Sequence, residues 1–167
     1  MILRTRHPGL VGGVAAILTT GLDQASKLFL LHVLHLADHP IRLTPFFDLV
    51  LAWNIGISFG WLQSDSQLVQ TALMAVKLVA VVALAIWLAR ARSVIAATGL
   101  GLIIGGAIGN AIDRLVHGAV VDFAWFHLQI GEKTFSWYIF NLADVAIVAG
   151  VIALLLDSFR SAPAKTP

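Results

Sequence analysis

The sequence predicts an all-α membrane protein with four transmembrane helices and a small outward-facing platform of β-structure and aromatic loops. The 167 residues are 59% hydrophobic and only 12% charged, and the mean hydropathy is +0.89. Four apolar runs approach or exceed the roughly 18 residues that a helix needs to cross a bilayer. We expect one integral membrane domain over residues 1–167, with helices at about 9–35, 68–89, 94–113 and 142–159, and outward loops at 36–67 and 115–140.

The first apolar run follows Arg4, Arg6 and His7. A basic start and an apolar run also outline a secretory signal, but no Ala-x-Ala-like site closes this run and three more apolar segments follow it. We therefore interpret it as a membrane helix. Asp23 and Lys27 lie four residues apart within it, on one helix face. Ionisable groups in a membrane segment indicate a functional site by default, so two interpretations stay open: a structural ion pair or part of an active site.

Three histidines follow near the end of the first run. His32, His35 and His39 recur at a spacing that resembles a metal-binding helix face, with Asp38 nearby. Pro40 favours a helix end at this point, and no matching ligand set occurs elsewhere in the chain. We expect interfacial histidines and no bound metal.

The first loop has strand character. The run from Phe47 to Trp53 predicts a short strand, and Asn54 follows it directly. Aromatic residues on both sides, including Phe59 and Trp61, suit the headgroup region of a bilayer. The loop either only rests on the membrane or also supplies Asn54 to a site at its surface.

The second and third apolar runs differ in what interrupts them. Lys77 lies near the middle of the second run, and its role cannot be deduced from the sequence. The third run carries glycines at 101, 105 and 109, which remove side chains along one face and favour close approach of another helix.

Basic residues predict the orientation. Four crossings place both termini on one side, and the positive-inside rule makes the side richer in Lys and Arg cytoplasmic. That side would carry Arg4, Arg6, Arg90, Arg92, Arg160 and Lys165, against Arg42 and Lys133 on the other. Both aromatic loops then face outward.

Polar residues from separate segments converge at one depth in this topology, just inside the outer surface. They are Asp23, Lys27, Asn54, Asn110, Asp113, Arg114, Asp122, Asn141 and Asp144. The chain has no cysteine, which excludes thiol catalysis, and no serine-nucleophile motif or cluster of metal ligands is evident.

Two aspartates can hydrolyse a peptide bond without a nucleophilic side chain or a metal ion. Close carboxyl groups in apolar surroundings share a proton, so one acts as acid and the other as base. Asp122 and Asp144 are the candidates. The alternative makes Asp122 a turn residue and Asp144 an acid that complements the helix dipole; spacing alone does not separate the two interpretations.

Five motifs in order resemble lipoprotein signal peptidase, the signal peptidase II family. They are Asp23-Gln-x-x-Lys27, Asn54-x-Gly-x-x-Phe59, Gly109-Asn-x-x-Asp-Arg114, Val120-Val-Asp-Phe123 and Asn141-x-Ala-Asp144. The resemblance covers the whole chain. Departures are slight: Ile57-Ser58 stands where small residues are common, and Leu142 replaces a frequent Ile.

The resemblance implies an intramembrane aspartic endopeptidase of the bacterial inner membrane, with both termini cytoplasmic and the active site near the periplasmic face. It would cut the signal peptide of a diacylglyceryl-modified prolipoprotein before the lipidated cysteine. Asp122 and Asp144 would be catalytic. Substrate-binding or supporting roles would fall to Asn54, Asn110, Arg114, Asn141, Asp23 and Lys27, with Asp113 structural.

We expect no cofactor and no metal. The expected partners are the lipid-modified substrate and membrane lipids. The net charge of +2 gives no support to a nucleic-acid partner, and the expected enzyme is compatible with a monomer.

Two rival functions remain to be weighed. A small transporter would place acids at the midpoint of a pore-facing helix, whereas these aspartates gather at one end. A non-catalytic assembly subunit would show glycine packing and buried polar pairs alone.

Overall fold

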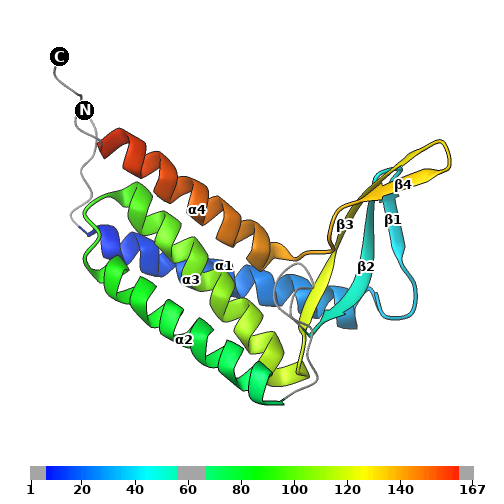
Figure 1. Ribbon diagram of the computed structural model, residues 1–167, viewed down its shortest axis with the longest axis horizontal. Coiled ribbons are helices and arrows are strands. Elements are labelled where there is room, and N and C mark those ends of the chain that lie inside the picture. Colours follow the sequence, from blue (N-terminus) through cyan, green and yellow to red (C-terminus); the bar gives the residue numbers. More distant parts are fainter. Residues whose placement is uncertain (1–6, 56–66, 162–167) are drawn as a thin grey trace.

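The computed structural model describes residues 7–55 and 67–161. Helices α1 (Pro8–His32), α2 (Gln67–Ala89), α3 (Val94–His117) and α4 (Leu142–Ser161) form a bundle, and one antiparallel sheet lies at its end (Figure 1). The fold is mostly helical but not all-α. Seven residues named in the sequence analysis lie outside the described residues: Arg4, Arg6, Ile57, Ser58, Phe59, Trp61 and Lys165.

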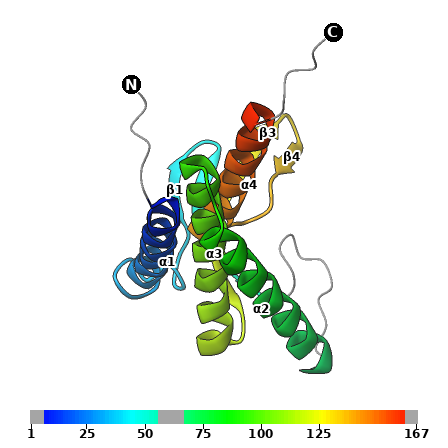
Figure 2. The same ribbon diagram turned by 90° about the vertical axis from the view of Figure 1, so that its left-hand side faces the viewer.

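Helix α3 is the centre of the bundle, in contact with α1, α2 and α4 (Figure 2). Its glycines allow this close packing. Gly105 faces the backbone of Ala16, where a Cβ atom would lie 2.5 Å from the carbonyl oxygen, and Gly106 faces Ala143 on α4 at the same distance. The predicted close approach along the glycine series is therefore confirmed for the α1–α3 contact.

Two helix ends differ from the expected bounds. Helix α3 runs to His117 rather than 113, because apolar residues continue it until Gly118 stops it in a left-handed conformation with φ of 73°. Helix α1 ends at His32 rather than near 35, where His35 adopts a φ of 49° that a helix does not permit. Asn110 and Asp113 lie in the last turns of α3, as expected, and Arg114 lies inside the helix rather than just beyond its end.

The sheet contains β1 (Ile41–Thr44), β2 (Phe47–Asn54), β3 (Val120–Ile130) and β4 (Lys133–Ser136) in that order. The predicted strand at Phe47–Trp53 is confirmed. The second segment, expected as a loop, is instead largely the 11-residue strand β3. Its β-branched and aromatic residues favour an extended backbone, and Gly131, with φ of 61°, turns the chain into β4.

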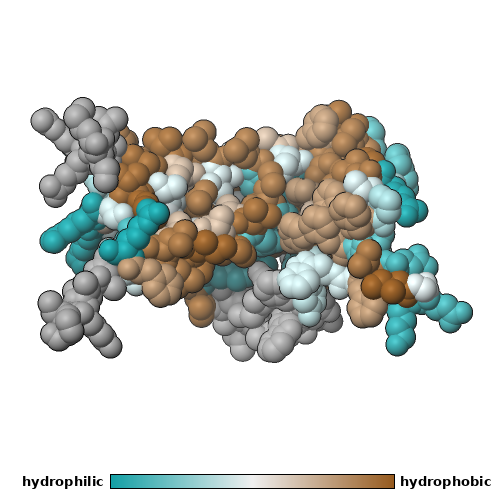
Figure 3. Space-filling model, turned by 90° about the horizontal axis from the view of Figure 1, so that it is seen from above, coloured by the Kyte–Doolittle hydropathy of each residue, from teal (hydrophilic) through white to brown (hydrophobic). Residues whose placement is uncertain are grey.

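The helix surface is apolar. Among the residues that the structure describes, three helical stretches are long and apolar enough to cross a membrane: Pro8–His32, Val94–His117 and Leu142–Arg160. Large side chains such as Ile17 and Phe159, 74% and 77% exposed, would face lipid rather than water. Hydrophobic residues cover the helices and hydrophilic ones gather at both ends (Figure 3). Within α2, residues 75–89 form a shorter apolar helix.

Candidate active site

The start of α4 is closed by a reciprocal pair of hydrogen bonds between Asn141 and Asp144. The backbone N–H of Asp144 donates to Asn141 Oδ1 over 3.1 Å, and the N–H of Asn141 donates to Asp144 Oδ2 over 3.2 Å. This is a capping box, which satisfies two unpaired amides at the helix start. Asp144 therefore lies at the N-terminus of a helix, as the interpretation of this residue as a helix-dipole acid expected. Its Oδ1 atom also accepts a hydrogen bond from Asn110 Nδ2 over 3.1 Å.

Strand β3 brings Asp122 to the start of α4. The carbonyl of Phe140 accepts hydrogen bonds from the backbone N–H groups of Phe123 and Ala124 over 3.0 and 2.8 Å. These bonds attach the strand to the residue before Asn141. Asp122, expected in a loop, therefore occupies a strand and is only 3% exposed.

Both oxygens of Asp122 accept hydrogen bonds from asparagine amides. Asn141 Nδ2 donates to Oδ1 over 2.6 Å, and Asn54 Nδ2, at the end of β2, donates to Oδ2 over 3.0 Å. A carboxylate that accepts two N–H donors is held in one orientation.

Asn110 and Asn141 connect the two aspartates. Asn141 Nδ2 donates to Asn110 Oδ1 over 3.1 Å as well as to Asp122, while Asn110 Nδ2 donates to Asp144. Each asparagine has its amide oxygen and nitrogen engaged, so neither can rotate without losing bonds. Two carboxyl groups from β3 and α4 are thereby fixed against one amide pair.

A buried ionic cluster lies beneath this pair. Lys27 Nζ lies 2.7 Å from an oxygen of Asp23 and 2.7 Å from an oxygen of Asp113, and it donates to Asn110 Oδ1 over 3.2 Å. Asp23, Lys27 and Asp113 are at most 2% exposed. Removing one member of such a cluster leaves an uncompensated buried charge.

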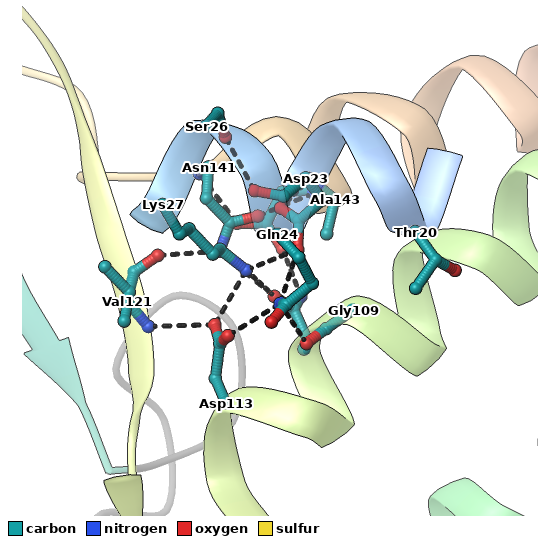
Figure 4. Close-up of polar contacts among 12 residues, drawn as sticks. Thr20, Asp23, Gln24, Ser26, Lys27, Gly109, Asp113, Val121, Asn141 and Ala143 are labelled. Atoms are coloured by element: carbon teal, nitrogen blue, oxygen red, sulfur yellow. Dashed lines mark hydrogen bonds and ion pairs between the residues drawn. The ribbon is translucent and has the colours of Figure 1, made fainter. Parts of the chain in front are cut away.

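The cluster also fixes backbone next to the aspartates (Figure 4). Asp23 Oδ1 accepts the N–H of Ala143, one residue before Asp144, and Asp113 Oδ2 accepts the N–H of Val121, one residue before Asp122. Asp113 therefore does not only lie near the end of α3, because its hydrogen bond to Val121 also joins that helix to β3. Asp23 and Lys27 form a buried ion pair and belong to the structure that positions both aspartates.

Arg114 lies half-buried on the same helix end. Its Nη1 donates to the backbone carbonyl of Asn110 over 3.1 Å, and its charge interacts with those of Asp122, Asp113 and Asp144. A guanidinium in this place compensates some of the negative charge that the aspartates carry.

Burial raises the pKa of Asp122 from its usual 3.8 to about 6. The charge of Asp144 adds to this rise, while the hydrogen bonds from Asn54 and Asn141 and the charge of Lys27 oppose it. A carboxyl group with such a pKa exchanges its proton close to neutral pH, as an acid–base catalyst must.

Metal-ligand geometry does not occur in the described part of the chain, where no group of three or more His, Asp or Glu side chains is arranged to hold an ion. His32, His35 and His39 are all exposed at the end of α1.

Two polar features were missed in the sequence. Gln24 Nε2 donates to Asp113 Oδ1 over 2.8 Å and to the carbonyl of Gly109 over 3.1 Å, and its place between Asp23 and Lys27 was the available signal. His127 Nε2 lies 3.0 Å from Asp48 Oδ2 within the sheet. That pair depends on strand register, for which the sequence offered no signal.

The fold and the site define a class of protein: a helical membrane protein with paired aspartates held at the end of its bundle. Residues 15–160 match the signal peptidase (SPase) II family. A lipoprotein signal peptidase of Nitrobacter hamburgensis is 62% identical over 95% of this chain and 96% of its own. A lipoprotein signal peptidase of Rhodopseudomonas palustris strain TIE-1 is 58% identical over 96% of this chain and 99% of its own.

The chain belongs to the signal peptidase II family and is therefore a peptidase. A solved structure of a bacterial membrane enzyme, obtained by the in meso method, has the same fold, with a TM-score of 0.73 at 23% identity over 93% of this chain and 94% of that one. This protein is accordingly a bacterial membrane peptidase that acts on signal peptides.

Proposed function

We propose that this peptidase removes the signal peptide from lipoprotein precursors by aspartic catalysis, with Asp122 and Asp144 as the catalytic pair. The observation that carries the proposal is the pair of amides, Asn110 and Asn141, to which both carboxyl groups are hydrogen-bonded from different elements. The names of the close relatives support the choice of lipoprotein precursors as substrates.

One carboxyl group would act as base and the other as acid. The ionised one takes a proton from water as the water oxygen bonds to the peptide carbonyl carbon, and the protonated one donates to the carbonyl oxygen. Breakage of the C–N bond then passes a proton to the leaving nitrogen. Such a pair needs each group in its own protonation state near neutral pH, which a pKa of about 6 for Asp122 supports.

The surrounding polar groups would have supporting roles. Asn54, Asn110 and Asn141 orient the carboxyl groups through the bonds described above. Arg114 offsets negative charge and binds the substrate backbone, while Asp23 and Lys27 hold the start of α4 and the end of α3 together.

The substrate would be a precursor whose cysteine carries a diacylglyceryl group, cut just before that cysteine. Its lipid would keep the scissile bond at the depth where β3 meets α4. We place α2 as a fourth span, both termini in the cytoplasm of an inner-membrane protein, and the aromatic sheet at the periplasmic headgroup level, in keeping with the basic residues Arg90, Arg92 and Arg160 at the other end.

The test is cleavage of a lipid-modified precursor by Asp122→Asn and Asp144→Asn proteins. Each exchange removes the ionisable group with little change of shape, so we expect a loss of at least about a thousandfold in rate. Asp38→Asn, at an exposed position, is the matched control and should cut normally. Full cleavage by either site variant would disprove the aspartate pair, and loss of wild-type activity in EDTA would disprove a metal-independent mechanism.

A further inference from the structure

Lys77 is a charged residue of α2 for which neither the fold nor the proposed catalysis has a use. Its neighbours in the helix are almost all apolar, and its side chain is half-buried. It makes no hydrogen bond or ion pair with any described residue. A lysine in an apolar membrane helix is costly to insert, so it marks a functional position.

Helix geometry directs Lys77 toward the site. Helices α2 and α3 are joined through only four residues, 90–93, and pack against each other, so they run in opposite directions. Side chains lean toward the start of their own helix. Lys77 therefore leans toward the sheet end of the bundle, while Arg114 leans back from it, as its bond to the Asn110 carbonyl shows. The ammonium group of Lys77 and the guanidinium group of Arg114 are therefore directed toward the same level along the bundle axis, one from each end.

The electrostatic neighbours of Lys77 agree with this geometry. Its charge interacts with those of Arg114 and Asp144, and Arg114 also interacts with Asp122. Two cations that repel each other are thus held beside the proposed catalytic pair. An anion near both would relieve that repulsion.

We propose that Lys77 and Arg114 form a carboxylate-binding site that receives the new C-terminus of the cleaved signal peptide. The proposal rests on the proposed function. Hydrolysis breaks the C–N bond, joins the water oxygen to the carbonyl carbon and leaves a carboxylic acid that loses its proton at neutral pH. The carboxylate forms next to two acidic side chains and in apolar surroundings, where only a compensating cation stabilises it.

The experiment compares two product peptides as inhibitors of precursor cleavage. Both have the sequence of the signal peptide up to the cut, and one ends in a free carboxylate while the other ends in an amide. The wild-type enzyme should bind the acid about tenfold more tightly, the effect of one charge-assisted hydrogen bond. Lys77→Met should lose most of this preference, and Lys77→Arg should keep it. Lys133→Met, which removes a lysine from exposed β4, is the matched control and should behave as wild type.

Equal affinity of the wild-type enzyme for acid and amide would overturn the proposal, as would an unchanged preference in Lys77→Met. Loss of the preference for the acid peptide when phosphatidylglycerol is added to the detergent would overturn it too. That result would show that Lys77 and Arg114 bind a lipid phosphate instead. Thermal unfolding of each variant shows that it is folded, with Lys77→Gln as a second neutral exchange. Failure of the enzyme to cut any lipid-modified precursor would instead contradict the proposed function, so the two failures are distinguishable.

Discussion

The carboxylate of Asp23 lies so close to the α-carbon of Gly109 that no side chain fits there. A Cβ atom on Gly109 would overlap the Oδ2 atom of Asp23 and lie 3.1 Å from its Cγ atom. Gly101 and Gly105, by contrast, face the backbone of α1. The third glycine of the series therefore provides room for a member of the ionic cluster and is more than a packing residue.

Gly109→Ala should displace Asp23 and with it the bonds to Lys27 and Ala143. We expect a loss of about 3 kcal/mol in the free energy of unfolding, as for an overpacked core, together with a fall in cleavage. Thermal unfolding followed by tryptophan fluorescence in detergent measures the first effect. Gly13→Ala is the control, because nothing lies within 4 Å of a Cβ atom there, and it should stabilise the helix by up to about 1 kcal/mol. Similar behaviour of the two variants would contradict this role of Gly109.

Lys27→Met should leave Asp23 and Asp113 buried without their shared cation. Breaking a buried ion pair from one side typically costs about 3–5 kcal/mol, and we expect a loss of this size near neutral pH. The exposed control Lys133→Met should change the unfolding free energy by less than about 0.5 kcal/mol. The double variant Lys27→Met with Asp113→Asn should recover part of the loss, and a double variant less stable than Lys27→Met would contradict the assigned pairing.

Much of the helical part was predictable because its physical signals are local. An apolar run and a glycine series each act within a few residues. The runs predicted the helices, and the glycines predicted a close helix contact whose partner, α1, only the structure shows. The ends of the helices were less predictable. Leu115 and Val116 prolong α3 because nothing before Gly118 stops it, and that shift places Arg114 inside the helix.

The parts that were not predictable depend on register between distant strands. Asp48 and His127 meet only because β2 pairs with β3 in one particular alignment. The role of Asp113 was underestimated for the same reason, since its partner Val121 is defined by where β3 begins. The candidate aspartates were identified from their apolar surroundings and the family resemblance, whereas the amide bridge between them required the structure.

Asn141→Ser should separate the two roles of Asn141. Serine caps a helix about as well as asparagine, so the start of α4 should be kept, and the unfolding free energy should fall by no more than about 1–3 kcal/mol for the lost amide bonds. Serine has no amide to reach Asp122 and Asn110 together. Loss of a hydrogen bond to a charged group corresponds to about a ten- to hundredfold effect, which we expect in kcat for precursor cleavage. A variant that is strongly destabilised, or one that cuts at the wild-type rate, would contradict this separation of the capping role of Asn141 from its role in orienting Asp122.

The pH dependence of stability should differ between the wild-type protein and Asp122→Asn. Because the pKa of Asp122 is about 6 in the folded protein and 3.8 is its usual value, the folded state binds the extra proton between these values. Its contribution to stability is therefore full below about 3.8 and is lost as the pH rises through 6, a change of about 3 kcal/mol. Asparagine does not titrate, so the variant should gain stability relative to the wild type by up to this amount between pH 4 and pH 7.5. Unfolding measured at both pH values gives the difference, in which pH-independent effects of the substitution cancel. A difference that stays constant, or that shifts in favour of the wild type as the pH rises, would show that burial does not raise this pKa.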